Sequence, residues 1–332
     1  MKSRSCERKT TSTDILLLTA LEEEGAAVEA AMPRVGMHRV LKRPNYDVFE
    51  LCDGGSRITC ARITLGGIGR LESAVSATIA CIKFQPKFVL LVGIAGGFRE
   101  HRWGLRNSQV NLGDILIADY LFDLDTRRIS AIDDIGVIPK TFKLRDPELR
   151  IVRAVSGSSW EKMIPAQLRE HSRLQVHIGP MISGDVLLAS DECPSIARLC
   201  KTAMHTGPGP IGIEMEGAGV ALAVDHYNVG TGFLMIRGVS DFADRSKKID
   251  EVKGRKLATY TAANFAVEVI RSQELRSFLH QHDRVSELIP VPLLLESKPL
   301  RWRDTHSHSP TSAIHPDVEA VSVRRHNYGA LT

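Results

Sequence analysis

The sequence has little of what marks several common classes of protein. Its six cysteines include no Cys-x-x-Cys pair and no compact cluster with histidine, which argues against a zinc site or a disulfide framework. No apolar run approaches the roughly 18 residues of a membrane-spanning helix, and the polar N-terminus lacks the apolar core of a signal peptide. A net charge of +4 is too small to indicate nucleic acid as the main partner. We therefore expect a cytoplasmic protein that binds neither membranes nor nucleic acid.

Short apolar runs alternate with helical patterns along most of the chain. The runs 15–21, 57–64, 87–97, 112–123, 176–190 and 232–241 predict strands, the fifth with a loop, and 22–32, 71–84, 216–227 and 260–275 predict helices. This alternation predicts an α/β fold: a three-layer αβα sandwich with a mixed, mostly parallel twisted sheet. Within 71–84, an apolar face is formed by Ala74, Val75, Thr78, Ile79 and Ile82.

Changes in amino-acid composition divide the chain into three parts. Residues 1–13 form a polar N-terminal segment, and residues 14–276 form the single catalytic domain that we predict. Residues 285–332 carry scattered prolines, serines and histidines without any sustained period, so we expect a poorly ordered tail.

Acidic residues and glycines follow several of the predicted strands. Ligands of open α/β sheets bind where strands end, and Glu24, Gly93, Gly96 and Asp241 fall at such ends, while Glu216 begins a helix. We expect these residues to meet in one cleft. Carboxylates without a metal suit the cleavage of a glycosidic bond, in which one acid protonates the leaving group and another carboxylate activates water or stabilises the sugar cation. Because hydrolases of many kinds use paired acids, this pattern indicates only a class of reaction.

Five motifs carry a more specific resemblance. VGIAGG, LGDILIAD, SGD, EMEGAGVA and RGVSDFAD, in this order and spacing, resemble the nucleoside phosphorylase and nucleosidase superfamily over roughly residues 14–272. The opening ALEEEG is similar to that of the methylthioadenosine/S-adenosylhomocysteine nucleosidases. The resemblance implies a nucleoside phosphorylase-like catalytic domain that hydrolyses a purine N-ribosidic bond, adenine being the favoured base. It implies no metal or organic cofactor, and a homo-oligomer whose cleft is completed at a subunit interface.

The resemblance also implies a role for each motif. Asp241 would protonate purine N7, and Ser240 would orient that carboxyl group. Glu216 would bind the ribose hydroxyls with Met215 against the sugar, and Glu24 would activate the attacking water.

Other positions would line the base. Val186, Leu187 and Leu188 would contact it, although Leu187 stands where many nucleosidases have an aromatic residue for stacking. Gly93 and Gly96 would let the ligand approach the backbone closely.

Two departures favour hydrolysis over phosphorolysis. Bacterial hexameric phosphorylases hold phosphate with an arginine and a serine at the positions of Leu91 and Ile94, and this chain also offers glutamates in its opening loop. A phosphate anion would therefore meet negative charge and apolar walls. Ile94 also lacks the hydroxyl that nucleosidases can use there.

Cationic residues near these motifs raise a further hypothesis. Arg70, Arg99, Arg102 and Arg106, with the DRSKK run 244–248, could bind phosphate, so the substrate could be AMP or ATP. The motifs also resemble phosphorylase-like modules of bacterial immune effectors, some of which strip adenine from ATP, which suggests an anti-phage role.

Several alternatives stay open. They are a phosphate-dependent purine nucleoside phosphorylase, a catalytically silent nucleotide-binding sensor, and an effector gated by a regulatory protein that docks on the tail or the N-terminal segment. For single residues, Arg237 could form a structural ion pair, and Asp114 and Asp185 are favoured as turn or cap residues.

Overall fold

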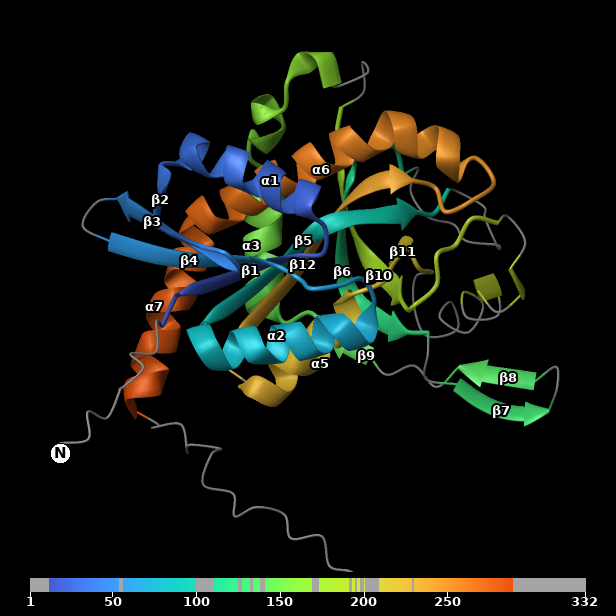
Figure 1. Cartoon of the computed structure of the whole chain (residues 1–332), viewed down its shortest axis with the longest axis horizontal. Helices are drawn as coiled ribbons and strands as arrows, with labels where there is room; N and C mark the ends of the chain where they lie inside the picture. The colour runs from blue at the N-terminus through green and yellow to red at the C-terminus, as the bar shows by residue number, and fades with distance from the viewer. Residues whose placement is uncertain are drawn as a thin grey trace, which may run out of the picture. The chain divides into compact units, whose positions relative to one another are not determined.

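The fold is a mixed α/β sandwich, as the sequence predicts. The computed structural model describes residues 12–53, 56–99, 110–124, 127–131, 134–137, 141–168, 173–190, 193–194, 196–197, 200, 209–228 and 230–288. A large sheet runs through the molecule, with α1 (Glu22–Ala31) and α6 (Lys247–Arg271) on one face and α2 (Arg70–Phe84) and α5 (Gly217–Tyr227) on the other (Figure 1).

The remaining elements complete the chain order. The strands are β1 (Ile15–Thr19), β2 (Met37–Arg43), β3 (Tyr46–Asp53), β4 (Ser56–Thr64), β5 (Phe88–Gly97), β6 (Ile115–Asp123), β7 (Arg127–Ala131), β8 (Asp134–Val137), β9 (Thr141–Lys143), β10 (Val176–Ser183), β11 (Gly212–Glu214) and β12 (Gly232–Asp241). The other helices are α3 (Asp146–Ser156) and α7 (Gln273–Leu288), with short 3₁₀ turns at Met32–Val35, Trp160–Met163 and Ala166–Leu168.

The sheet order brings distant parts of the chain together. It runs β11-β10-β6-β12-β5-β1-β4-β3-β2, and β1, β5 and β12 are parallel neighbours whose carboxyl ends share one edge. Strand β11 also pairs antiparallel with β5, where Gly212 lies opposite Gly97 and Ile213 opposite Gly96. The strands β5, β12, β6, β10 and β11 therefore close into a ring. Antiparallel pairs also join β2, β3 and β4 at the far edge, which makes the sheet mixed.

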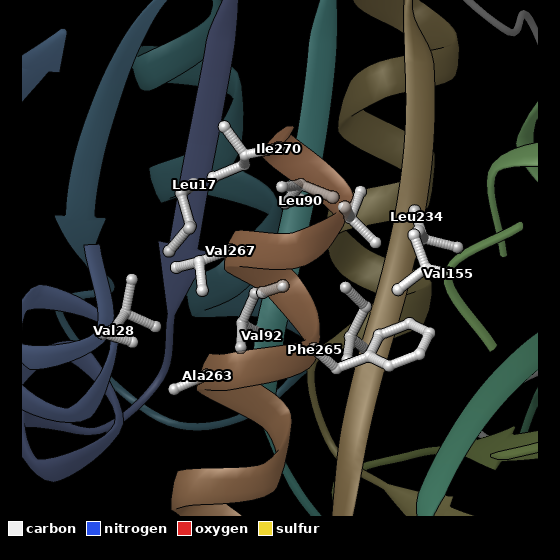
Figure 2. Close-up of a cluster of buried hydrophobic side chains, with 14 of the residues drawn as sticks. Leu17, Val28, Leu90, Val92, Val155, Leu234, Ala263, Phe265, Val267 and Ile270 are labelled. Atoms are coloured by element: carbon white, nitrogen blue, oxygen red, sulfur yellow. The ribbon is translucent and has the colours of Figure 1, made fainter. Parts of the chain in front are cut away.

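Two apolar layers hold the sandwich together. On one face, Leu17, Leu90 and Leu234 of neighbouring strands meet Val267 and Ile270 of α6 (Figure 2). On the other face, a second cluster joins the sheet to α2 and α5. Because both faces are covered, the central strands are apolar along most of their length and show no alternation. Burial of these side chains contributes roughly 1.5–3 kcal/mol for each large residue.

Helix α2 departs from its predicted packing. Its buried side chains are mostly small, namely Ser73, Ala77, Ala80, Cys81 and Phe84. The large apolar residues face outward: the exposed fractions are 73% for Leu71, 51% for Val75, 61% for Ile79 and 59% for Ile82. The apolar face that the sequence predicts is therefore not the core face. Small residues occupy the core side because α2 lies close to α5, where the backbone of Arg70 approaches Gly219. We call the four exposed residues the α2 stripe.

The helical part of the chain extends past the predicted domain end. Helix α7 continues to Leu288, so residues 285–288 of the predicted tail are helical, and Phe278 packs edge-on against Phe88 at 5.2 Å between ring centroids. Residues 1–11 and 289–332 lie outside the described residues, and the domain limits stay a prediction. No helix in the described ranges is both long and apolar enough to cross a membrane.

Candidate active site

An open cavity lies at the shared carboxyl edge of β1, β5 and β12. It encloses about 730 Å³ of empty space and is also walled by the segment after β10, by β11 and by the start of α6. All thirteen predicted site residues fall in the described part of the chain, and ten of them line this cavity: Glu24, Ile94, Gly96, Val186, Leu187, Leu188, Met215, Glu216, Ser240 and Asp241. Distant segments thus converge on one pocket, although their chemical roles stay a prediction.

Asp241 ends β12 and is buried, with 1% of its surface exposed. Its Oδ1 accepts a hydrogen bond of 2.7 Å from the backbone N–H of Ala243. Its Oδ2 lies 2.8 Å from Ser240 Oγ and 2.8 Å from Lys247 Nζ. Ser240 Oγ also lies 3.2 Å from the Ala95 carbonyl oxygen, and its one proton can serve only one of these acceptors at a time. The contacts fix the orientation of the carboxyl group at the cavity wall.

Glu24 is held by backbone N–H groups of the turn before α1 and of β5. Its Oε2 accepts hydrogen bonds of 2.9 Å from the N–H groups of Ala20 and Leu21, and its Oε1 accepts one of 2.9 Å from Ile94. Burial raises the pKa of Glu24 above its ordinary value, and the positive charge of Arg237 partly offsets that rise. A carboxylate with a raised pKa is a better proton acceptor near neutral pH.

Glu216 lies with Glu214 around a buried arginine. Arg237 Nη2 donates to Glu216 Oε2 at 3.0 Å and forms a closer ion pair with Glu214. Burial raises the pKa of Glu216, Arg237 lowers it, and the nearby charge of Glu214 raises it further. Burial alone would lower the pKa of Arg237, but Glu214, Glu216 and Glu24 together raise it. We call Glu24, Glu214, Glu216 and Arg237 the acidic floor.

Aliphatic side chains line the mouth of the cavity. Leu187 stands 71% exposed at the mouth, next to the buried Leu188, and Ile68 faces it from the loop before α2. Among the described residues that line the cavity none is aromatic, so a base there would contact methyl and methylene groups.

Three predicted residues lie outside the lining. Gly93 sits behind the floor, where a Cβ atom would come within 2.6 Å of Glu24 Oε1 and would also collide with Arg237. This glycine therefore makes room for the floor and does not face the cavity. Arg99 stacks its guanidinium on Phe242 and pairs with Asp244 and Asp250. Arg102 and Arg106 lie outside the described residues.

Arg70 is the third predicted residue outside the lining, and carboxylates bind both its guanidinium and its backbone N–H group. Its side chain pairs with Asp123 at 2.7 Å, and its backbone N–H at the start of α2 donates to Asp185 Oδ1 at 2.6 Å. The carboxylate of Asp185 thus fills the anion site that the helix start was expected to offer to phosphate. The preceding N–H, of Gly69, donates to Glu216 Oε1 at 3.3 Å and so joins this loop to the floor.

Sequence reasoning missed part of the lining. Glu251 and Arg255 line the cavity, and the sequence analysis does not place them there. Lys247, also in the lining, belongs to the DRSKK run that the sequence suggests for phosphate, and Arg237, directly behind the cavity, makes the structural ion pair that the sequence allows. One signal was available for Arg237, because a single charge inside an otherwise apolar strand needs a buried partner. The positions 247, 251 and 255 repeat every four residues on one helix face, but that pattern alone is typical of solvent-exposed helices.

The described residues contain no group of three or more His, Cys, Asp or Glu side chains arranged to hold a metal ion. The arrangement instead offers one carboxyl group at the cavity wall, three more in the floor, and a wide opening. Such a set can donate a proton to a bound ligand on one side and accept one from water on the other.

The chain is similar in sequence or in fold to several known nucleosidases. A 5′-methylthioadenosine/S-adenosylhomocysteine nucleosidase from Maridesulfovibrio salexigens is 26% identical over 219 residues, which cover 65% of this chain and 84% of that protein. A death domain-containing ATP nucleosidase from Amphimedon queenslandica is 29% identical over 194 residues, which cover 55% of this chain but only 33% of that protein. Among solved structures, a 5′-methylthioadenosine/S-adenosylhomocysteine nucleosidase from Neisseria meningitidis, in complex with methylthio-immucillin-A, superposes with a TM-score of 0.55 at 22% identity, covering 78% of this chain and 99% of that one.

The sequence as a whole matches one protein family. The match spans residues 14–271, close to the range over which the five motifs resemble nucleosidases, and it includes the strands and loops that line the cavity. The chain belongs to the phosphorylase superfamily.

Proposed function

We propose that this protein, a purine nucleosidase, hydrolyses the N-ribosidic bond of an adenine nucleoside or nucleotide. The observation that carries the proposal is the convergence of Asp241, Glu216 and Glu24, from three distant parts of the chain, on one cavity. The named relatives support it, since both are nucleosidases of adenine-containing compounds by name.

The geometry supports a separate chemical role for each of the three acids. Asp241, when protonated, donates its proton to N7 of the purine, and the electron pair of the C1′–N9 bond leaves with the base. Glu216 holds the ribose hydroxyls while the sugar becomes an oxocarbenium-like cation. Glu24 takes a proton from a water molecule, which adds to C1′. The products are the free base and the free sugar, or the sugar phosphate where the substrate is a nucleotide. Glu24 then releases to solvent the proton that it took from water, and Asp241 takes one up from solvent, which restores both groups.

The floor favours water over phosphate as the nucleophile. Glu24 occupies the N–H groups of Ala20, Leu21 and Ile94 that an anion would otherwise use, and it places negative charge there. Leu91, at the position where hexameric phosphorylases carry arginine, is fully buried in β5. An incoming phosphate would face repulsion in a site of low dielectric constant.

A substrate panel tests the reaction. The purified protein is incubated with ATP, AMP, adenosine and methylthioadenosine, with and without inorganic phosphate, and the products are separated by chromatography. We expect free adenine and free sugar without any need for phosphate. Turnover only with phosphate would establish the phosphorylase alternative, and tight binding without release of base would favour the silent sensor.

We further propose that a nucleotide, AMP or ATP, is the preferred substrate. The ATP nucleosidase among the relatives supports this, as do the cations Lys247 and Arg255 in the cavity wall. An enzyme that strips adenine from ATP would deplete the energy supply of an infected cell, which is the basis for proposing an anti-phage role in the cytoplasm. Cleavage of methylthioadenosine alone would contradict the nucleotide proposal.

The α2 stripe supports a homo-oligomer. Its four exposed large apolar side chains follow directly after Ile68, which lines the cavity. Contiguous exposed apolar surface beside a ligand site is typical of an interface between proteins. A second copy seated on the stripe would lie beside the cavity, because Ile68 of the preceding loop lines it. A regulatory protein that docks on the terminal segments stays an alternative partner, tested by whether activity appears only after that partner is added or the tail is removed.

A further inference from the structure

We propose that Lys247 and Arg255 form the subsite for the 5′-phosphates of the substrate, and that phosphate binding withdraws Lys247 from Asp241. This inference rests on the proposed hydrolysis of a nucleotide and names the residues that would select it. Both side chains line the cavity together with Asp241.

The two cations share one face of α6. Lys247, Glu251 and Arg255 are spaced by four residues, so their side chains follow one another along the helix. Lys247 is 13% exposed and Arg255 is 39% exposed, which leaves both within reach of a ligand in the cavity. We call these three residues the α6 wall.

The chemistry of a β-ribonucleoside places C5′ near this wall. The base and C5′ lie on the same face of the ribose ring, and the 2′ and 3′ hydroxyls lie on the opposite face. If Glu216 holds those hydroxyls and Asp241 faces the base, C5′ points away from the floor and toward the side of Asp241. That side is the one formed by α6, because Lys247 Nζ lies 2.8 Å from Asp241 Oδ2.

The charges of the wall can exchange partners. Lys247 Nζ also lies 3.0 Å from Glu251 Oε1, and Arg255 meets the half-exposed Glu23 through its Nε at 2.6 Å. A guanidinium carries further N–H donors at its outer end, so Arg255 can hold Glu23 and a phosphate oxygen together. Arg237, by contrast, is the buried cation of the floor and already binds Glu214 and Glu216.

The contact between Lys247 and Asp241 has a consequence for proton donation. A lysine ammonium is a donor only, so its contact with Oδ2 suits the carboxylate and opposes a proton on that oxygen. A proton donor to N7 needs the carboxylic acid. A phosphate group that attracts the ammonium of Lys247 would free Oδ2, and Asp241 would then take up a proton from solvent. A nucleoside without phosphates would leave Lys247 in place, and its turnover would be slow.

Steady-state kinetics on AMP, ATP and adenosine test this mechanism. In Lys247→Ala, Oδ2 of Asp241 is free with either substrate, so we expect kcat for adenosine to rise toward that for the nucleotides, while KM for the nucleotides increases. The ratio of kcat/KM for nucleotides to that for adenosine should drop at least about tenfold. In Arg255→Gln, we expect the KM for nucleotides relative to that for adenosine to increase by about tenfold. Lys248→Ala is the matched control, since Lys248 is exposed on the next position of α6 and does not line the cavity, and we expect no change.

The outcomes separate this inference from the function on which it rests. If Lys247→Ala slows adenosine and nucleotides equally, or leaves their ratio unchanged, the phosphate subsite is wrong while the nucleosidase stands. If the wild-type protein releases adenine from adenosine but not from nucleotides, the subsite is again wrong. If no substrate is cleaved, the proposed function fails. Calorimetric binding of ATP and adenosine to wild type and Arg255→Gln then decides the subsite alone: it stands only if the variant loses affinity for ATP selectively.

Discussion

The acidic floor and the α6 wall are two charged surfaces of the same cavity, and they are built differently. Floor charges are buried and bound to backbone N–H groups and to Arg237, all of which are set by the sheet. Wall charges are more exposed, and their ion pairs, with one another and with Asp241 and Glu23, join side chains alone. The floor can therefore hold a sugar in one fixed position, whereas the wall can change its contacts during a reaction cycle.

The largest expected effect comes from the residue at which floor and wall meet. In Asp241→Asn the amide cannot supply the proton, and we expect adenine release to fall about 10²–10⁴-fold. Chromatographic initial rates measure this, and a thermal melt shows whether the fold persists. If the variant is as active as the wild type, Asp241 is not the proton donor, and the functional distinction between the floor and the wall is wrong.

The floor should depend strongly on its central cation. In Arg237→Met, the carboxylates of Glu214 and Glu216 lose their shared partner in a buried site, and we expect the free energy of unfolding to fall by about 3–5 kcal/mol. Urea unfolding monitored by circular dichroism measures it. Arg255→Met is the wall counterpart and should cost less than about 1 kcal/mol, because its ion pair is exposed. Similar losses in both variants would contradict the comparison.

The floor should also make stability depend on pH. Burial raises the folded-state pKa of Glu24 above its ordinary value of 4.5, so the stability that Glu24 contributes is complete below that value and is lost as pH rises through the folded pKa. In Glu24→Gln this loss is absent, so we expect the stability of the variant relative to wild type to increase as the pH rises above 4.5. Urea midpoints at several pH values measure the difference. A variant whose relative stability falls as pH rises would contradict the assigned direction.

The smallest effect on folding is expected outside both surfaces. Ile79→Glu in the α2 stripe should change unfolding free energy by no more than about 0.5 kcal/mol, because the side chain is 61% exposed. It should nevertheless shift the protein toward monomers in sedimentation experiments and lower its activity. Val40→Glu, which adds the same charge at an exposed apolar position of β2, should leave the assembly unchanged. Persistence of the assembly in Ile79→Glu would separate the stripe from subunit contact.

Much of the fold and of the cavity could be predicted from the sequence, and the reasons are local. The buried strands β1, β5 and β12 are continuous apolar runs, and motifs at their ends placed Glu24, Gly96 and Asp241 in advance. Strands β2 and β3 were not predicted, because β2 is mostly exposed and its polar side chains show no strong alternation.

The incorrect predictions concerned contacts between residues that are distant in the sequence. Arg70 looked suited to phosphate, but Asp123 and Asp185, which are distant in sequence, occupy its side chain and its N–H. Val75 and Ile79 gave α2 an apolar face whose direction periodicity cannot specify, since an apolar stripe suits an interface as well as a core. Only the tertiary arrangement decides such cases.

The closure of the strand ring through β11 limits where the enzyme can move. Main-chain pairing of Gly212 with Gly97 ties the segment that carries Glu214 to the end of β5, and a side chain at Gly212 would collide with the Gly96 carbonyl. The side of the pocket that holds the sugar is therefore fixed in position and cannot open during turnover. Entry of substrate and escape of product must be accommodated by the opposite rim, where Leu187 and the first turn of α6 meet solvent.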